Sequence, residues 1–144
     1  MKISKKCQYA LKAVFELAWR NQGEPIRTHE IAEAQRVSHR FMEIILNELK
    51  HGGFVNSRRG NEGGYMLALD ASKLTVRKII EYIEGPISLV QNNDDTTSVG
   101  NEAFAELWQE INNAVGKTCE NKSFADLVEF ERAKRDKCAL NYSI

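Results

Sequence analysis

The sequence predicts a mainly α-helical protein with one small β-hairpin, in which a winged helix-turn-helix is followed by a long C-terminal dimerisation helix. Three observations predict this fold. A short helix, a tight turn and a longer helix are expected in succession between residues 28 and 50. Two β-prone runs then flank a glycine-rich basic turn. Farther along, a helix near residues 101–118 has an apolar face that the small preceding core has little room to cover.

The length of 144 residues allows one modest core with a helical extension, which argues against a large enzyme with separate domains. We expect a DNA-binding domain in residues 1–86, a loop in 87–100, and the dimerisation and C-terminal helices in 101–144. No apolar run approaches the roughly 20 residues that a membrane span needs, and the N-terminus lacks the apolar core of a signal peptide. The sequence therefore predicts a cytoplasmic protein.

Charge is distributed unevenly along the chain, although the net charge is zero. Residues 1–69 contain 11 Lys and Arg and 7 Asp and Glu, a balance of +4, whereas residues 70–144 contain 9 and 13, a balance of −4. A basic front half can face phosphate while an acidic rear half faces away from it.

The first helix is expected at about residues 5–21, with Ser4 as its N-cap. Thr28 is expected to cap a brief helix at residues 29–35.

The longer helix is expected at residues 39–50, with Ser38 as its N-cap. Its period of 3.6 residues separates an apolar face from a polar face. The apolar face is expected to hold Phe41, Ile44, Ile45 and Leu49, and the polar face His39, Arg40, Glu43, Asn47 and Lys50.

The hairpin is expected to pair residues 54–57 with residues 64–69 across the turn 58–63, forming a wing. Thr75 then precedes a helix that ends at Gly85 and should pack against the first helix. Its apolar side is expected to hold Val76, Ile79, Ile80 and Ile83.

The long helix near residues 101–118 is expected to form a homodimer, because a second copy is the natural cover for its apolar stripe. The stripe consists of Phe104, Leu107, Trp108, Ile111 and Val115. Ser123 can cap a final helix that runs to about Lys137 and is apolar at Phe124, Leu127 and Val128.

Double-stranded DNA is the expected partner. The longer helix has polar and charged side chains at its N-terminal end, and that is the end which presents side chains to base edges when such a helix lies in a major groove. Arginines at a wing tip suit a narrow minor groove, where negative potential is concentrated. Residues at helix starts can contact phosphate. The candidate DNA-binding residues are Lys5, Lys6, Thr28, Ser38, His39, Arg40, Glu43, Arg58, Arg59 and Gly60.

Three cysteines, Cys7, Cys119 and Cys138, are widely spaced and include no CxxC pair, so neither a disulfide framework nor a zinc finger is expected. The three histidines are equally dispersed, and no catalytic arrangement is spelled out locally. We therefore expect no metal, no cofactor and no enzymatic activity. Cys7 and Cys119 remain candidate redox thiols, with inert burial as the alternative.

Three segments carry a family resemblance: MKISKKCQYALKAVFELA, IAEAQRVSHRFMEIILNELKHGGFVNSRRGNEGGYMLALD and LTVRKIIEYIEGP. Together they resemble the Rrf-two family of bacterial winged-helix regulators over residues 1–86. The motif RGxxGGY after a helix-turn-helix, present here at residues 59–65, is a fairly specific mark of the family. The resemblance implies a homodimer on the long helix and a palindrome-like operator. It also implies base reading by Ser38, Arg40 and Glu43, with Arg59 in the minor groove.

One departure from the family affects the mechanism. Members that bind an iron–sulfur cluster have three cysteines in the loop before the dimerisation helix, whereas residues 89–100 here contain none. Gln8 and Lys12 also stand where some cluster-binding relatives have acidic or histidine ligands. The sequence therefore predicts a cluster-free branch, and it does not identify the effector or partner protein that is sensed.

The favoured function is a sequence-specific transcriptional regulator, in particular a repressor. Two alternatives remain open. One is a winged-helix protein-interaction module, and the other is a thiol-redox sensor that regulates through a partner protein. Arg40, Arg58 and Arg59 favour DNA, because a protein-binding wing has no need of that cluster.

Overall fold

The computed structural model describes residues 2–90 and 98–142, and within these ranges the chain is mainly helical with one antiparallel hairpin. This confirms the predicted fold class. The elements in chain order are α1 (Lys5–Trp19), α2 (Thr28–Gln35), α3 (His39–His51), β1 (Val55–Arg58), β2 (Gly64–Leu67), α4 (Val76–Glu84), α5 (Asn101–Glu120) and α6 (Phe124–Tyr142). Residues 91–97 of the expected loop lie outside the described residues.

Helix α1 is the centre of the core, and α2, α3, α4 and α6 all pack against it. Its buried stripe is made largely of small and branched apolar residues, which allow close helix approach: Ala10, Ala13, Val14, Leu17 and Ala18. A buried carboxylate, Glu16, is satisfied by Arg20 at 2.6 Å and by the Gln35 amide at 2.6 Å. This network ties α1 to α2 without leaving a polar group unpaired.

The capping predictions are confirmed at Ser4 and Ser38, and Thr75, which is predicted to precede a helix, caps α4. Each of these side chains accepts a backbone N–H three residues ahead. Ser123 also accepts a hydrogen bond from Asp126 N–H at 3.1 Å, at the start of α6.

The prediction that Thr28 is an N-cap is wrong, because Thr28 is the first residue of α2. Arg27 occupies the cap, and its backbone N–H donates to the Glu30 carboxylate at 3.2 Å. Glu30 therefore satisfies the N-cap backbone donor itself.

The predicted apolar face of α3 is half wrong. Phe41 is 58% exposed and Ile44 is 53% exposed. The buried stripe is Met42, Ile45, Leu46 and Leu49. Both assignments contain Ile45 and Leu49, so the error is one of helical phase. It arises because six apolar residues between positions 41 and 49 offer two overlapping stripes.

Several ends differ from the predicted ones by a few residues. α1 stops at Trp19 rather than at residue 21, and β2 stops at Leu67 rather than at residue 69. α6 runs to Tyr142, beyond the predicted end at Lys137, because no glycine or proline interrupts residues 138–142.

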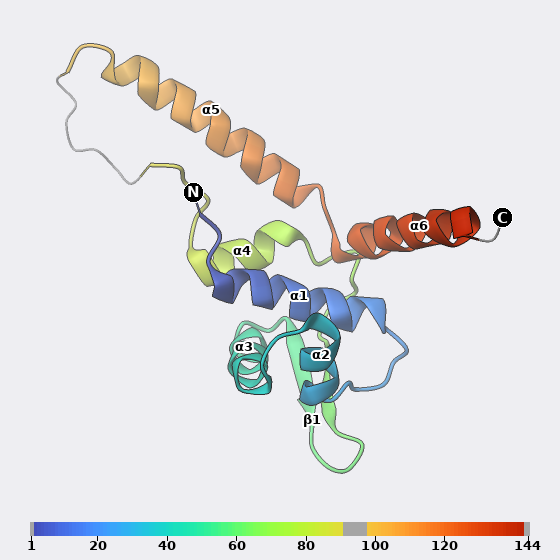
Figure 1. Cartoon of the computed structure of the whole chain (residues 1–144). Helices are drawn as coiled ribbons and strands as arrows, with labels where there is room; N and C mark the ends of the chain where they lie inside the picture. The colour runs from blue at the N-terminus through green and yellow to red at the C-terminus, as the bar shows by residue number, and fades with distance from the viewer. Residues whose placement is uncertain (1, 91–97, 143–144) are drawn as a thin grey trace.

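The molecule has two distinct sides about α1. α3 and the hairpin lie on one side, whereas α4, α5 and α6 lie on the other, as Figure 1 shows. α4 packs against α1, as predicted, and α5 packs against α4. The N-terminal half of α5 then projects away from the rest of the protomer (Figure 1). Across the described ranges, no helix has both the length and the apolar character to cross a membrane.

Candidate nucleic-acid interface

The start of α3 presents polar side chains to solvent. Ser38 fixes this end by accepting a hydrogen bond from Phe41 N–H at 3.3 Å. His39, Arg40 and Glu43 are all exposed, and His39 Nδ1 lies 3.7 Å from a Glu43 carboxylate oxygen. These groups supply donors and acceptors of the kind that read base edges in a major groove.

The wing is a regular hairpin held at its base by a third segment. β1 and β2 pair from Val55 opposite Leu67 to Arg58 opposite Gly64. Ile26 then forms a bridge with Tyr65, with both backbone N–H···O distances at 2.8 Å. This bridge fixes the wing relative to the start of α2.

The two adjacent glycines of the RGxxGGY motif are required by close backbone approach. A Cβ on Gly63 would lie 2.4 Å from the Arg58 carbonyl oxygen, and a Cβ on Gly64 would lie 2.4 Å from the Ile26 carbonyl oxygen. Real Cβ atoms do not approach backbone this closely. Gly63 is therefore required by the tight turn of the wing, and Gly64 by the contact between the wing and the strand-like segment at Ile26.

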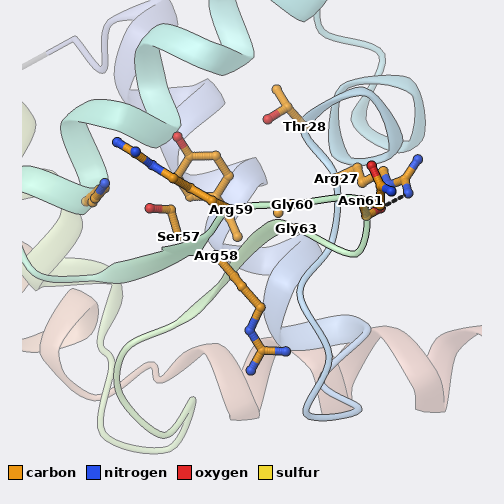
Figure 2. Close-up of a pocket in the computed structure, with 11 residues that line it drawn as sticks. Arg27, Thr28, Ser57, Arg58, Arg59, Gly60, Asn61 and Gly63 are labelled. Carbon is orange, nitrogen blue, oxygen red and sulfur yellow. Dashed lines mark hydrogen bonds between the residues drawn. The ribbon is translucent and has the colours of Figure 1, made fainter.

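An open groove of about 590 Å³ lies between the wing, the start of α2 and Lys50 near the end of α3 (Figure 2). Four predicted site residues line it: Thr28, Arg58, Arg59 and Gly60. The structure adds Arg27, Lys50, Ser57, Asn61, Gly63, Gly64 and Tyr65. Arg27 donates a hydrogen bond to the Asn61 carbonyl, which joins the wing tip to the α2 cap.

Sequence reasoning missed Arg27 and Lys50 as members of this basic groove. The helical period predicts Lys50 on the polar face of its helix, but its proximity to the wing depends on the tertiary fold. Arg27 carried a usable signal, because it is a basic residue directly before a helix start, where anions bind.

The two wing arginines are held differently and leave the hairpin in different directions (Figure 2). Arg58 lies 4.0 Å from the Glu24 carboxylate, and both groups are exposed. Arg59 has no salt bridge within residues 2–90 and 98–142. Of the two, Arg59 is the more available for a nucleic-acid contact.

The remaining predicted contacts, Lys5 and Lys6, lie at the start of α1 and do not line the groove. Both lysines are exposed, and Lys6 is paired with Glu48 of α3 at 2.8 Å.

The predicted dimer stripe lies on the projecting helix α5. Phe104 is 58% exposed and Leu107 is 42% exposed. Trp108, Ile111 and Val115 are half-buried, and the rings of Phe104 and Trp108 stack with centroids 6.3 Å apart.

The cysteines do not fit an iron–sulfur cluster. Cys7 is buried in α1, Cys119 is half-buried near the end of α5, and Cys138 is exposed in α6. No group of three or more His, Cys, Asp or Glu side chains in the part of the chain that the structure describes is placed to hold a metal ion. All three cysteines and all three histidines lie in that part. The donor set therefore gives no basis for cluster chemistry.

Neither candidate redox thiol is activated. Burial, with a smaller contribution from the negative charge of Glu84, raises the pKa of Cys7 from 9.0 to about 11. Burial also raises the pKa of Cys119, although Arg77 opposes this effect. Thiol oxidation proceeds through the thiolate, so these surroundings argue against a redox role.

We expect iodoacetamide at pH 8 to alkylate Cys138 of the folded protein and to leave Cys7 unmodified. The Cys7 thiol is covered and protonated, because its pKa is about 11. The same shift affects stability, because the pKa of Cys7 is higher in the folded state than in the unfolded chain. The contribution of this thiol to the free energy of unfolding is therefore full below about pH 9 and is lost as pH rises through about 11. Mass spectrometry of digested protein checks the labelling, with guanidinium-unfolded protein as the control. Rapid labelling of folded Cys7 would contradict the prediction.

The model of the Rrf2 family, which is described as an iron-dependent transcriptional regulator, matches residues 3–130 of the chain. The chain is 32% identical to the HTH-type transcriptional regulator CymR of Bacillus subtilis (strain 168) over 136 residues, covering 94% of this chain and 96% of that protein. It is 28% identical to the HTH-type transcriptional regulator IscR of Yersinia pseudotuberculosis, covering 89% and 79%.

Solved structures show the same likeness. The structure of CymR, described as the global cysteine regulator of B. subtilis, matches with a TM-score of 0.82 and 33% identity, covering 90% of this chain and 98% of that one. An IscR structure from T. potens matches with a TM-score of 0.74 and 26% identity, covering 91% and 88%. These relatives are transcriptional regulators rather than enzymes. The chain belongs to the Rrf2 family and is a DNA-binding transcriptional regulator with a winged helix-turn-helix.

Proposed function

We propose that this regulator is a sequence-specific repressor that binds a palindrome-like operator as a homodimer. The observation that carries the proposal is the placement of the two DNA-reading elements. The exposed polar start of α3 and the basic wing lie on one side of α1, and the apolar stripe of α5 lies on the other. A protomer arranged in this way can bind DNA and a second copy at the same time.

In this proposal, α3, the wing and the helix starts make different contacts with DNA. Arg40 and Glu43 of α3 face base edges in the major groove, where arginine pairs with guanine and glutamate accepts from cytosine. Arg59 enters the flanking minor groove, which the lack of a salt bridge to it in the described residues supports. Thr28 and Lys5 contact phosphate, and the groove residues Arg27 and Lys50 add positive charge beside them.

The homodimer is supported by the exposed apolar side chains of α5. Phe104 and Leu107 remain 58% and 42% exposed in the protomer, on a helix that projects from its own core. A second copy related by twofold symmetry covers the same stripe on both chains. The two recognition helices are then held at a fixed spacing, which a palindrome-like site matches. Repression follows when the bound dimer occupies promoter DNA, which places the protein with the chromosome in the cytoplasm.

Changing the helix and changing the wing should have different effects on DNA binding. Glu43→Ala should weaken the best site by about 1–3 kcal/mol and relax preference at one or two positions, with little effect on other DNA. Arg59→Ala should weaken binding most where A·T pairs flank the site, because groove width and potential hold the guanidinium. Both side chains are exposed, so the fold should survive. The measurement compares both variants and the wild type on a duplex obtained by in vitro selection, its scrambled version, and a version with G·C flanks.

Arg40→Ala is the companion variant for Glu43→Ala, because it removes a base contact and also one positive charge. It should lower nonspecific affinity slightly as well. Equal losses for the Glu43 and Arg59 variants on all three duplexes would show that neither residue reads DNA as proposed.

A salt titration separates the proposed function from a winged-helix protein-interaction module. Binding to mixed-sequence duplex should fall steeply with rising salt, because phosphate contacts release counterions. If the wild-type protein binds no duplex at low salt, the proposed function is wrong and the protein-interaction module takes its place.

A further inference from the structure

An apolar side chain lies in the middle of the outward face of α3. Ile44 is 53% exposed, and it follows Arg40 by four residues and precedes Asn47 by three. Residues at these spacings are neighbours on one face of a helix. Arg40 and Asn47 are polar and exposed, so with Ile44 between them the surface expected to face base pairs is not uniformly polar.

The fold itself gives no reason for isoleucine at this position. The inward face of α3 is already complete with Met42, Ile45, Leu46 and Leu49, which are all buried. The apolar stripe assigned to dimerisation belongs to α5, on the other side of α1 (Figure 1). Ile44 is therefore an apolar group that the protomer exposes at the centre of its candidate DNA surface.

We propose that Ile44 contacts the C5-methyl group of a thymine in the major groove, so that the operator contains a thymine read without a hydrogen bond. The inference rests on the proposed function, because it requires α3 to lie in that groove. Thymine is the base that presents a methyl group there, and apolar side chains are its usual partners. Contact between the two removes apolar surface of both from water.

The same side chain penalises other bases. Isoleucine has no donor or acceptor, so a purine in this position places its N7 and its exocyclic group against a side chain that cannot pair with them. Cytosine lacks the methyl group and brings an amino group instead. Discrimination thus comes from a favourable contact with thymine and from unpaired polar groups with its competitors.

Phe41 widens this apolar surface. It lies three residues before Ile44 and is 58% exposed. Ile44 remains the reading residue, because it lies between Arg40 and Asn47 on the outward face, whereas Phe41 lies toward the edge of that face.

The test removes one methyl group from DNA at a time. In a duplex obtained by in vitro selection with the wild-type protein, each thymine is replaced singly by deoxyuridine, which keeps the Watson–Crick pair. At one thymine in each half-site, wild-type affinity should fall about threefold to fivefold, the effect of one lost methyl contact. In Ile44→Ala the same replacement should have no effect. Ile44→Val keeps a branched apolar side chain and should retain most of the difference.

Phe130→Ala is the matched control, because it truncates a similarly exposed apolar side chain on α6 and should keep the full thymine effect. Circular dichroism checks that each variant is folded, which the exposure of Ile44 predicts. The proposal is overturned if the wild type binds its selected site but no thymine replacement weakens it, or if the selected half-site has no thymine. It is equally overturned if Ile44→Ala keeps the full difference. Each of these results leaves sequence-specific binding intact, whereas a wild type that selects no sequence overturns the proposed function itself.

Discussion

Leu107→Glu is expected to convert the protein from a dimer into a monomer and to weaken operator binding by about 100-fold or more. Leu107 is 42% exposed in the protomer, so the change leaves the protomer core unaltered but places a charge in the proposed interface. A monomer engages one half-site at a time and loses the effective concentration that the dimer gives the second. Light scattering should give the 16.4 kDa chain mass for the variant and twice that mass for the wild type.

Gln109→Glu is the matched control, because it adds the same charge to the same helix at an exposed position away from the stripe. It should remain dimeric and keep its operator affinity. If Leu107→Glu stays dimeric with full affinity, the apolar stripe of α5 is not the subunit interface. If the wild type is itself a monomer at micromolar concentration, the proposed homodimer is wrong.

The error at Phe41 and Ile44 shows where sequence periodicity stops being informative. Both the predicted stripe and the observed one fit a period of 3.6 residues. The choice between them is made by the positions of α1 and α2, against which α3 packs. One of the two misplaced residues, Ile44, is also the one with a proposed DNA contact. An apolar side chain on an outward face raises the apparent hydrophobicity of the wrong side of the helix, which misleads a prediction from periodicity.

The groove beside the wing shows a second limit of prediction from sequence, because its residues are brought together by the tertiary fold. Arg27 and Asn61 are 34 residues apart, and they meet because Ile26 bridges Tyr65 beside the hairpin. This isolated bridge is a single pair of residues, too short to leave a strand pattern in sequence. By contrast, the caps at Ser4, Ser38 and Thr75 were predictable, because each depends on groups within three residues.

Gly64→Ala is expected to destabilise the protein by about 2–4 kcal/mol and to weaken binding to A·T-flanked DNA as Arg59→Ala does. The Cβ would lie 2.4 Å from the Ile26 carbonyl oxygen and 2.5 Å from its carbon, and Gly64 has φ +154°. The bridge with Tyr65, with its two 2.8 Å hydrogen bonds, must open to relieve this overlap. The wing then loses its attachment to the start of α2, and Arg59 loses its fixed position. Urea unfolding and duplex binding measure the two effects.

Gly60→Ala separates the backbone overlap from the cost of positive φ. Gly60 lies in the same wing with φ +109°, but a Cβ there would meet nothing within 4 Å. It should therefore show only the conformational cost of about 1 kcal/mol, and the bridge at Tyr65 should stay closed. Gly64→Ala should exceed this cost clearly, because it adds a clash with backbone atoms that cannot rotate away.

If the two variants unfold at the same urea concentration, the contact with Ile26 is not what requires glycine at this place in the RGxxGGY motif. If Gly64→Ala is destabilised but binds A·T-flanked and G·C-flanked duplexes as the wild type does, the bridge stabilises the fold without positioning Arg59.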